Sequence, residues 1–105
     1  MNDNFSELCT KIALWQKEIF PKSDQASKWN HLAKEVIELQ KALESGIGIP
    51  EELADCFILL IGISALEGLE VQQIIEDKFD INLKRKWGEP DKNGVVLHIK
   101  DGENG

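Results

Sequence analysis

The stretch "EELADCFILLIGISAL" (Glu51–Leu66) begins with acidic residues and continues, after Asp55, as an almost unbroken apolar run. Its length and composition predict a helix that is apolar on nearly every side. Proline favours the first turn of a helix and glycine often follows the last, so Pro50 and Gly68 set the expected ends. We therefore expect a central helix over residues 50–66, with its acids crowded at the N-terminal end.

Helical periodicity continues on both sides of this segment and predicts three more helices. They cover Phe5–Phe20, Ser27–Glu44 and Val71–Trp87. The loop "KSDQAS" supplies Ser or Asp caps, and the glycines of "SGIGIP" separate the second helix from the third. Short connections between four helices favour an antiparallel four-helix bundle. We predict an all-α fold.

The chain ends in a different pattern. "VVLHIK" reads as a short extended segment and "DGENG" as disordered, so the tail from about residue 88 is expected to be partly extended or disordered. A length of 105 residues without an internal repeat predicts a single domain over residues 1–105.

The charge balance restricts the partners. A net charge of −7 argues against binding a nucleic-acid polymer, which needs a basic face. It does not exclude a small anionic substrate, provided that a metal cation lies between substrate and protein. A hydrophobic fraction of 42% suffices for a core, although chains this small are often completed by a partner subunit.

The compartment is predicted from cysteines and hydropathy. Cys9 and Cys56 form no CxxC pattern, and Cys56 lies in an apolar run, so we expect a buried thiol and not half of a disulfide. No signal peptide precedes the first helix, and Cys56–Leu66 is too short to cross a bilayer, which takes about 20 apolar residues. These features predict a cytoplasmic protein without a membrane partner.

Two pairs of acids recur at the same spacing. "EVIEL" (Glu35–Leu39) places Glu35 and Glu38 three residues apart, and Glu52 and Asp55 repeat that spacing. In a helix each pair lies on one face, where like charges repel. The acids therefore need a cation, a basic partner or water.

Both a structural and a functional explanation fit these acids. Acids in the first turn after Pro50 are favourable at a helix N-terminus, and Glu35 or Glu38 can pair with Lys34 or Lys41. Alternatively, two pairs on adjacent helices converge into four carboxylates, which are hard oxygen ligands suited to Mg²⁺ or Mn²⁺. A di-iron site would require ExxH motifs, which are lacking at both pairs. His31, one turn before Glu35, can approach such a site or act as a packing residue.

The last predicted helix carries bases where a core face is expected. Its inward positions continue toward the C-terminus as Lys78, Asn82 and Arg85. These side chains either neutralise the carboxylates as buried ion pairs or hold phosphates, which Arg grips in a fork and Lys meets as a point charge. Trp15, Trp29 and Trp87 are core or interface candidates, one of which can stack on a base.

With these motifs the sequence resembles the MazG-like all-α nucleoside triphosphate pyrophosphohydrolases. Their ExxE, spacer and ExxD signature reads here Glu35-Val-Ile-Glu38, thirteen residues, then Glu52-Leu-Ala-Asp55. "KFDINLKRKWGEPDKNGVVLHI" resembles the K-x3-N-x2-R-x-W-G-x-P-D ending of small stand-alone members, and "LWQKEIF" their W-x4-F first helix. The resemblance covers Trp15 to Ile99.

The resemblance implies Mg²⁺-dependent hydrolysis of a (d)NTP to the monophosphate and pyrophosphate, by attack of a metal-activated water on the α-phosphorus. It also implies a homodimer or homotetramer. Carried over by position, the metal ligands are Glu35, Glu38, Glu52 and Asp55, and Glu38 or Glu35 serves the catalytic water. The substrate contacts are Lys78, Asn82, Arg85 and Lys86, with Trp15, Trp29 and His31 as further candidates. No P-loop is present, which argues against cleavage at the γ-phosphate by that route.

Two alternatives remain open at this point. One is a helical module that binds a nucleotide or a metal without turnover. The other is a structural protein in which the acids pair with Lys78 and Arg85. In the structural alternative, neutralising an acid destabilises the fold and Mg²⁺ leaves the melting temperature unchanged; in the enzyme, neutralisation spares the apo fold and abolishes metal binding.

Overall fold

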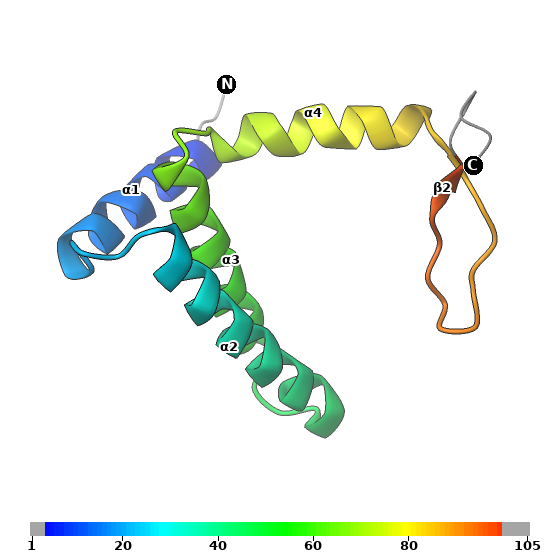
Figure 1. The fold of residues 1–105 in the computed structure, drawn as a ribbon, viewed down its shortest axis with the longest axis horizontal. Coiled ribbons are helices and arrows are strands. Elements are labelled where there is room, and N and C mark those ends of the chain that lie inside the picture. The colour runs from blue at the N-terminus through cyan, green and yellow to red at the C-terminus, as the bar shows by residue number, and fades with distance from the viewer. Residues whose placement is uncertain (1–3, 100–105) are drawn as a thin grey trace. The chain divides into compact units, whose positions relative to one another are not determined.

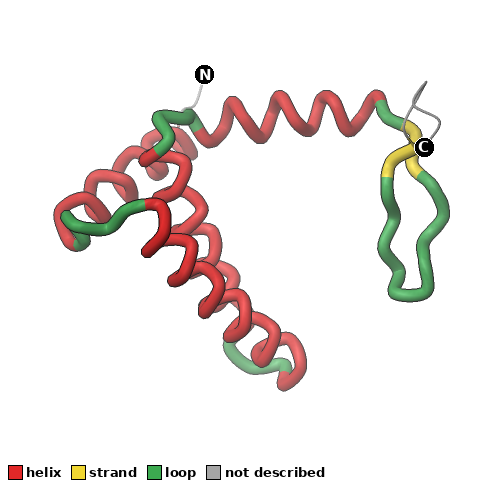
Figure 2. The backbone as a smooth tube through the Cα atoms, in the orientation of Figure 1, coloured by secondary structure: helices red, strands yellow, loops and turns green. Residues whose placement is uncertain are grey.

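The computed structural model describes residues 4–99 and contains four helices followed by two short strands (Figures 1 and 2). In chain order they are α1 (Asn4–Ile19), α2 (Gln25–Ser45), α3 (Ile49–Leu66), α4 (Val71–Lys84), β1 (Lys86–Trp87) and β2 (His98–Ile99). The predicted all-α class is confirmed, and the first three helices begin and end within two residues of the predicted bounds. The segment "DGENG" lies outside the described residues.

The chain divides between Gln72 and Gln73 into two compact units. The first holds α1, α2 and α3, and the second holds most of α4 and the two strands. The single-domain expectation stays a prediction.

In the first unit α3 occupies the central position that its apolar composition predicts. It packs against both α1 and α2, and α2 and α3 lie side by side as a helical hairpin (Figure 1). The buried core of this pair consists of Leu32, Cys56 and Leu59, with Leu39 and Ile63 packed against it. Cys9 and Cys56 are buried free thiols, which confirms the prediction made for Cys56. None of the helices within residues 4–99 is long and apolar enough to cross a membrane.

Caps and glycines define the ends of α2. The Asp24 carboxylate accepts a hydrogen bond from the Ser27 amide at 3.0 Å, and the Ser27 hydroxyl accepts one from the Asp24 amide at 2.9 Å. This reciprocal capping box fulfils the prediction that "KSDQAS" supplies the cap, and the bond from the Ser27 amide lowers the pKa of Asp24. At the other end Gly46 takes a left-handed conformation, φ 77°, which glycine adopts without strain.

Leu32, Val36, Leu39 and Leu43 recur along α2 at the spacing of a core face, but only part of this stripe is buried. Leu32 is buried and Leu39 packs on the core, but Val36 and Leu43 are 50% and 59% exposed. The reason is that α2 contacts α3 along one side of its cylinder, while the apolar residues of α2 extend over a wider arc. The first unit therefore leaves apolar side chains uncovered.

In the second unit the helix ends earlier than predicted. Helix α4 stops at Lys84 and not at Trp87, because Lys86 and Trp87 pair with Ile99 and His98 in an antiparallel ladder. The indole N–H of Trp87 donates to the main-chain oxygen of Asn82 at 3.0 Å and so takes up a carbonyl at the helix end. The predicted extended tail is confirmed at β2; its partner strand was not predicted.

A buried polar junction joins the three helices of the first unit. Gln16 of α1 is 3% exposed, and its amide donates to the main-chain oxygen of Ile58 in α3 at 3.0 Å. Lys28 of α2 is 6% exposed and donates from Nζ to Gln16 Oε1 at 3.2 Å. Gly62 leaves the space for this arrangement, since a Cβ there would lie 1.8 Å from Gln16 Oε1.

We expect Gly62→Ala to destabilise the fold by about 1–3 kcal/mol, because the new methyl group displaces Gln16 and breaks two hydrogen bonds of buried groups. Urea unfolding measures this loss. In a Gln16→Ala background the same change should cost much less, since the conflicting side chain is gone. Equal costs in the two backgrounds would contradict the junction.

Candidate active site and metal centre

Three acids from α2 and α3 converge. The hairpin brings the middle of α2 beside the N-terminal half of α3, and carboxylate oxygens of Glu35, Glu52 and Asp55 all lie within 4.8 Å of one another. Glu35 and Glu52 are half-buried, whereas Asp55 is exposed. The structure thus brings together three of the four acids predicted from the ExxE and ExxD motifs.

Glu52 is the least satisfied member of this cluster. Its Oε1 is buried and has no hydrogen-bond partner among the described residues. Burial raises the pKa of Glu52, and the neighbouring Glu35, Asp55 and Glu38 side chains raise it further. An orphaned carboxylate oxygen among like charges fits a hard divalent cation, since all of its neighbours offer oxygen ligands.

Glu38 lies one turn beyond Glu35 and outside the three-acid group. Its Oε2 is 3.5 Å from Nζ of Lys41, an exposed pair of the kind proposed as the structural explanation. Its charge nevertheless contributes to the raised pKa of Glu52, so it lies within electrostatic reach of the cluster. Its assignment as a fourth ligand stays a prediction.

A cavity of about 180 Å³ opens beside the acids. It is lined by Trp15, Gln16, Phe20, His31, Glu35, Asp55, Ile58 and Leu59. The rings of Trp15 and Phe20 meet edge to face, with centroids 5.9 Å apart. His31 Nε2 is 3.6 Å from Glu35 Oε2. Two predicted substrate contacts, Trp15 and His31, therefore share a cavity with two predicted metal ligands.

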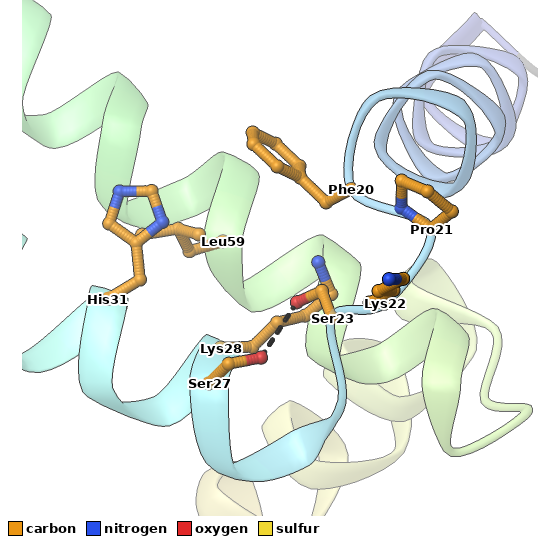
Figure 3. Close-up of a pocket in the computed structure, with 8 residues that line it drawn as sticks. All are labelled: Phe20, Pro21, Lys22, Ser23, Ser27, Lys28, His31 and Leu59. Atoms are coloured by element: carbon orange, nitrogen blue, oxygen red, sulfur yellow. Dashed lines mark hydrogen bonds between the residues drawn. The ribbon is translucent and has the colours of Figure 1, made fainter.

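A second cavity, of about 430 Å³, shares Phe20, His31 and Leu59 with the first (Figure 3). Its other lining residues are Pro21, Lys22, Ser23, Ser27 and Lys28. In Figure 3 the Phe20 and His31 rings stand apart, with Leu59 between them and the two serine hydroxyls hydrogen-bonded at 3.0 Å. The residues common to both cavities are aromatic or aliphatic, the second cavity adds polar side chains, and the acids Glu35 and Asp55 line only the first.

The predicted substrate contacts other than Trp15 and His31 lie on α2 or in the second unit. Trp29 is 61% exposed on α2. In the second unit Lys78 is exposed on α4, Asn82 is half-buried, and Lys86 is exposed in β1. Arg85 is half-buried with Nη1 3.5 Å from His98 Nδ1, and Asn82 Oδ1 is buried without a hydrogen-bond partner among residues 4–99. Their predicted contacts with substrate stay predictions.

Two buried side chains were not among the predicted site residues: Gln16, which lines the first cavity, and Lys28, which lines the second. The signal was available in the spacing. Lys28 precedes His31 by three residues and Glu35 by seven, which puts all three on one face of α2. The sequence signal is therefore a lysine on the same helix face as His31 and Glu35.

Cys56 belongs to the apolar core of α2 and α3 and is not a member of the three-acid group. Burial raises the pKa of its thiol, and the charges of Glu35, Asp55 and Glu52 raise it further. The candidate centre is therefore an all-oxygen site on an all-α scaffold.

Comparison with known proteins also points to an all-α enzyme with an acidic metal site. The dATP/dGTP pyrophosphohydrolase family matches residues 8–105. A dATP/dGTP diphosphohydrolase of cyanophage S-2L is 33% identical over 95 residues, which cover 90% of this chain and 87% of the relative. One of Salmonella phage PMBT28 is 32% identical over 91 residues, covering 87% of this chain but 30% of that longer protein.

A solved structure agrees with these sequence matches. The cyanophage S-2L MazG-like pyrophosphohydrolase, bound to dGDP and three catalytic Mn²⁺ ions per active site, superposes with a TM-score of 0.79 at 30% identity. The alignment covers 92% of this chain and 94% of that one. The chain belongs to the dATP/dGTP pyrophosphohydrolase family, and the predictions of a MazG-like fold and of a nucleotide pyrophosphohydrolase are confirmed.

The raised pKa of Glu52 predicts how the metal-free protein responds to pH. An acid whose pKa is raised by folding holds its proton more tightly when folded, so it lowers stability as pH rises above its ordinary value of 4.5. In a chelator, Glu52→Gln should therefore melt above the wild type at pH 7, and the gap should close as pH falls toward 4.5.

Glu51→Gln is the matched control for this experiment. Glu51 is the exposed neighbour in the first turn of α3, where an acid is favourable, so its neutralisation should give no gain. A lower melting temperature for Glu52→Gln at pH 7 would mean that Glu52 stabilises the fold through a partner.

Proposed function

We propose that this chain hydrolyses purine deoxynucleoside triphosphates to the monophosphate and pyrophosphate, with Mg²⁺ or Mn²⁺ as cofactor. The observation that carries the proposal is the convergence of Glu35, Glu52 and Asp55 within 4.8 Å, with a buried oxygen of Glu52 unpartnered. The family match and the nucleotide and Mn²⁺ ions of the S-2L relative support it.

The acids present fit a divalent cation. Glu35, Glu52 and Asp55 would hold it, with Glu38 as the fourth ligand supplied by the next turn of α2. When bound, the metal neutralises substrate phosphates and lowers the pKa of water. Without that positive charge the acid cluster repels a triphosphate, since the chain carries a net charge of −7.

The protein's own groups have separable roles in the reaction. A water attacks the α-phosphorus, the bond from that phosphorus to the β-phosphate oxygen breaks, and pyrophosphate leaves. Glu38 accepts the proton of the attacking water, because it lies beside the cluster and its Lys41 contact is exposed and weak. Glu35 orients the same water, and His31 lies 3.6 Å from Glu35 on the cavity side.

The bases of the second unit are proposed as phosphate contacts. Lys78 supplies a point charge, and Arg85 a planar fork for phosphate oxygens. Asn82 offers an amide whose oxygen is without a partner among the described residues, and Lys86 is the more peripheral candidate. Trp15 stacks on the nucleoside, since it lines the cavity, and Trp29 lies further out.

We expect the wild-type protein to release pyrophosphate and a deoxynucleoside monophosphate from dGTP or dATP with Mg²⁺ or Mn²⁺, and a chelator to abolish the reaction. Glu52→Gln should lower kcat/KM by roughly 100-fold or more, since losing even an outer-shell partner of a metal ligand costs 10–100-fold. Chromatography that separates pyrophosphate from orthophosphate measures both.

Metal binding itself distinguishes the alternatives. Added Mn²⁺ should raise the melting temperature of the wild type and leave that of Glu52→Gln unchanged. A metal-stabilised protein that turns over no triphosphate would be the non-catalytic binding module. If Mn²⁺ leaves the melting temperature of the wild type unchanged and Glu52→Gln destabilises the fold, the chain would be the structural protein.

We propose further that the chain forms a homodimer or homotetramer. Leu53, Phe57 and Leu60 follow one another at helical spacing along α3 and are 39%, 61% and 46% exposed. A contiguous apolar stripe on the central helix is typical of an interface, and a second copy offers a matching surface.

Phe57→Glu should shift the mass in solution, measured by light scattering, from two or four chains to one. Lys34→Glu, at an exposed polar position on α2, is the matched control and should leave the mass unchanged. A wild-type protein that is monomeric at all concentrations would refute the oligomer.

A further inference from the structure

We propose that Lys28 determines base specificity: its amino group donates to O6 and N7 of a 6-oxopurine, so that guanine-type substrates are preferred over adenine. This assignment rests on the proposed function, because it places the substrate's base in the hollow beside the acid cluster. It concerns a residue of the first unit that no sequence motif marked.

The burial of Lys28 is the first observation. The residue is 6% exposed although its side chain ends in a group that prefers water. Among the described residues, the ammonium group of Lys28 makes one hydrogen bond, to Gln16 Oε1 at 3.2 Å. The same Nζ lies 5.7 Å from the centre of the Phe20 ring. An ammonium group has three N–H donors, so two remain for a ligand.

The second observation is where these donors lie. Lys28 lines the cavity of about 430 Å³ that Phe20, His31 and Leu59 share with the acid-lined cavity (Figure 3). Phe20, His31 and Leu59 supply the aromatic and aliphatic part of its wall, which suits a flat uncharged ring system, and the remaining lining is mostly polar. The hydroxyls of Ser23 and Ser27 bond to each other at the rim. Lys28 is thus the buried charged donor of this cavity.

The third observation is the order of three side chains along α2, which sets the direction in which we place the substrate. Lys28, His31 and Glu35 follow at spacings of three and four residues on one face. Seven residues of helix span roughly 10 Å, comparable with the reach from the far edge of a purine to its α-phosphate. With the phosphates at Glu35 and the acids of α3, the base reaches Lys28 and the sugar passes His31.

The chemistry of the two purines then decides between them. Guanine presents two acceptors, O6 and N7, on one edge, whereas adenine presents the acceptor N7 and the donor N6. A lysine donates only, so it satisfies both guanine positions and faces the adenine amino group with a like donor. Removing the donor should therefore harm guanine substrates and spare adenine ones.

The test compares dGTP, dITP and dATP as substrates of the wild type and of Lys28→Met. dITP keeps O6 and N7 but lacks the 2-amino group, so it isolates the edge that Lys28 reads. We expect the wild type to prefer dGTP and dITP, and Lys28→Met to lower the dGTP-to-dATP ratio of kcat/KM by about 10-fold or more. An equal loss on all three nucleotides, or an unchanged ratio, would overturn the assignment.

Two further variants separate specificity from folding. Lys28→Gln keeps a donor for Gln16, so this variant should fold. It should also lower the dGTP-to-dATP ratio of kcat/KM, because an amide offers both a donor and an acceptor and can bond to either base. Lys34→Met, at an exposed position of the same helix, should leave the ratio as in the wild type.

A binding measurement makes the assignment independent of turnover. The product dGMP should raise the melting temperature of the wild type more than dAMP does, and Lys28→Met should remove the difference; equal shifts in the wild type would overturn the assignment. If the wild type hydrolyses no triphosphate, the proposed function fails, and this comparison alone decides whether Lys28 reads a 6-oxopurine.

Discussion

Mutual repulsion of carboxylates at the head of α3 is the constraint on which the rest of the structure depends. Glu35, Glu52 and Asp55 are held within 4.8 Å by a hairpin whose apolar core lies directly behind them. Hydrophobic burial of Leu32, Cys56 and Leu59 supplies the free energy that keeps the acids together. The core therefore holds like charges together, an arrangement that a divalent cation would stabilise.

The same hairpin also fixes what lies beside the acids. Gln16 and Lys28 tie α1 and α2 to the main chain of α3 at Ile58, three residues after Asp55. Gln16 lines the acid-lined cavity and Lys28 lines the larger one, so this buried junction lies beside both. The acid cluster and the buried junction therefore meet on one short segment of α3, residues 55–58.

Much of this arrangement could be predicted from the sequence because its signals are local. Periodicity, Pro50 and the glycines between α2 and α3 placed the helices, and the ExxE and ExxD spacing selected the acids that meet. What escaped prediction is long-range. The early end of α4 depends on strand pairing with residues 98–99, and the exposure of Val36 depends on which side of α2 meets α3. Periodicity alone marks neither.

The role of Gln16 was hidden for a related reason. A polar residue in an amphipathic helix reads as surface, and only the main-chain carbonyl of Ile58 makes it a buried one. Lys78 of α4, and Arg85 just beyond its end, were selected by helical spacing, which is a local property of the sequence.

The missing side chain at Gly62 has a consequence for how this sequence can change over time. Because the Gln16 amide occupies the space where a Cβ of residue 62 would stand, the residue types tolerated at positions 16 and 62 depend on each other, although 45 residues separate them. Enlarging residue 62 costs less once residue 16 has shortened, and shortening residue 16 removes the hydrogen-bond partner of Lys28. The cost of a replacement at any one of these three positions therefore depends on the residues at the other two.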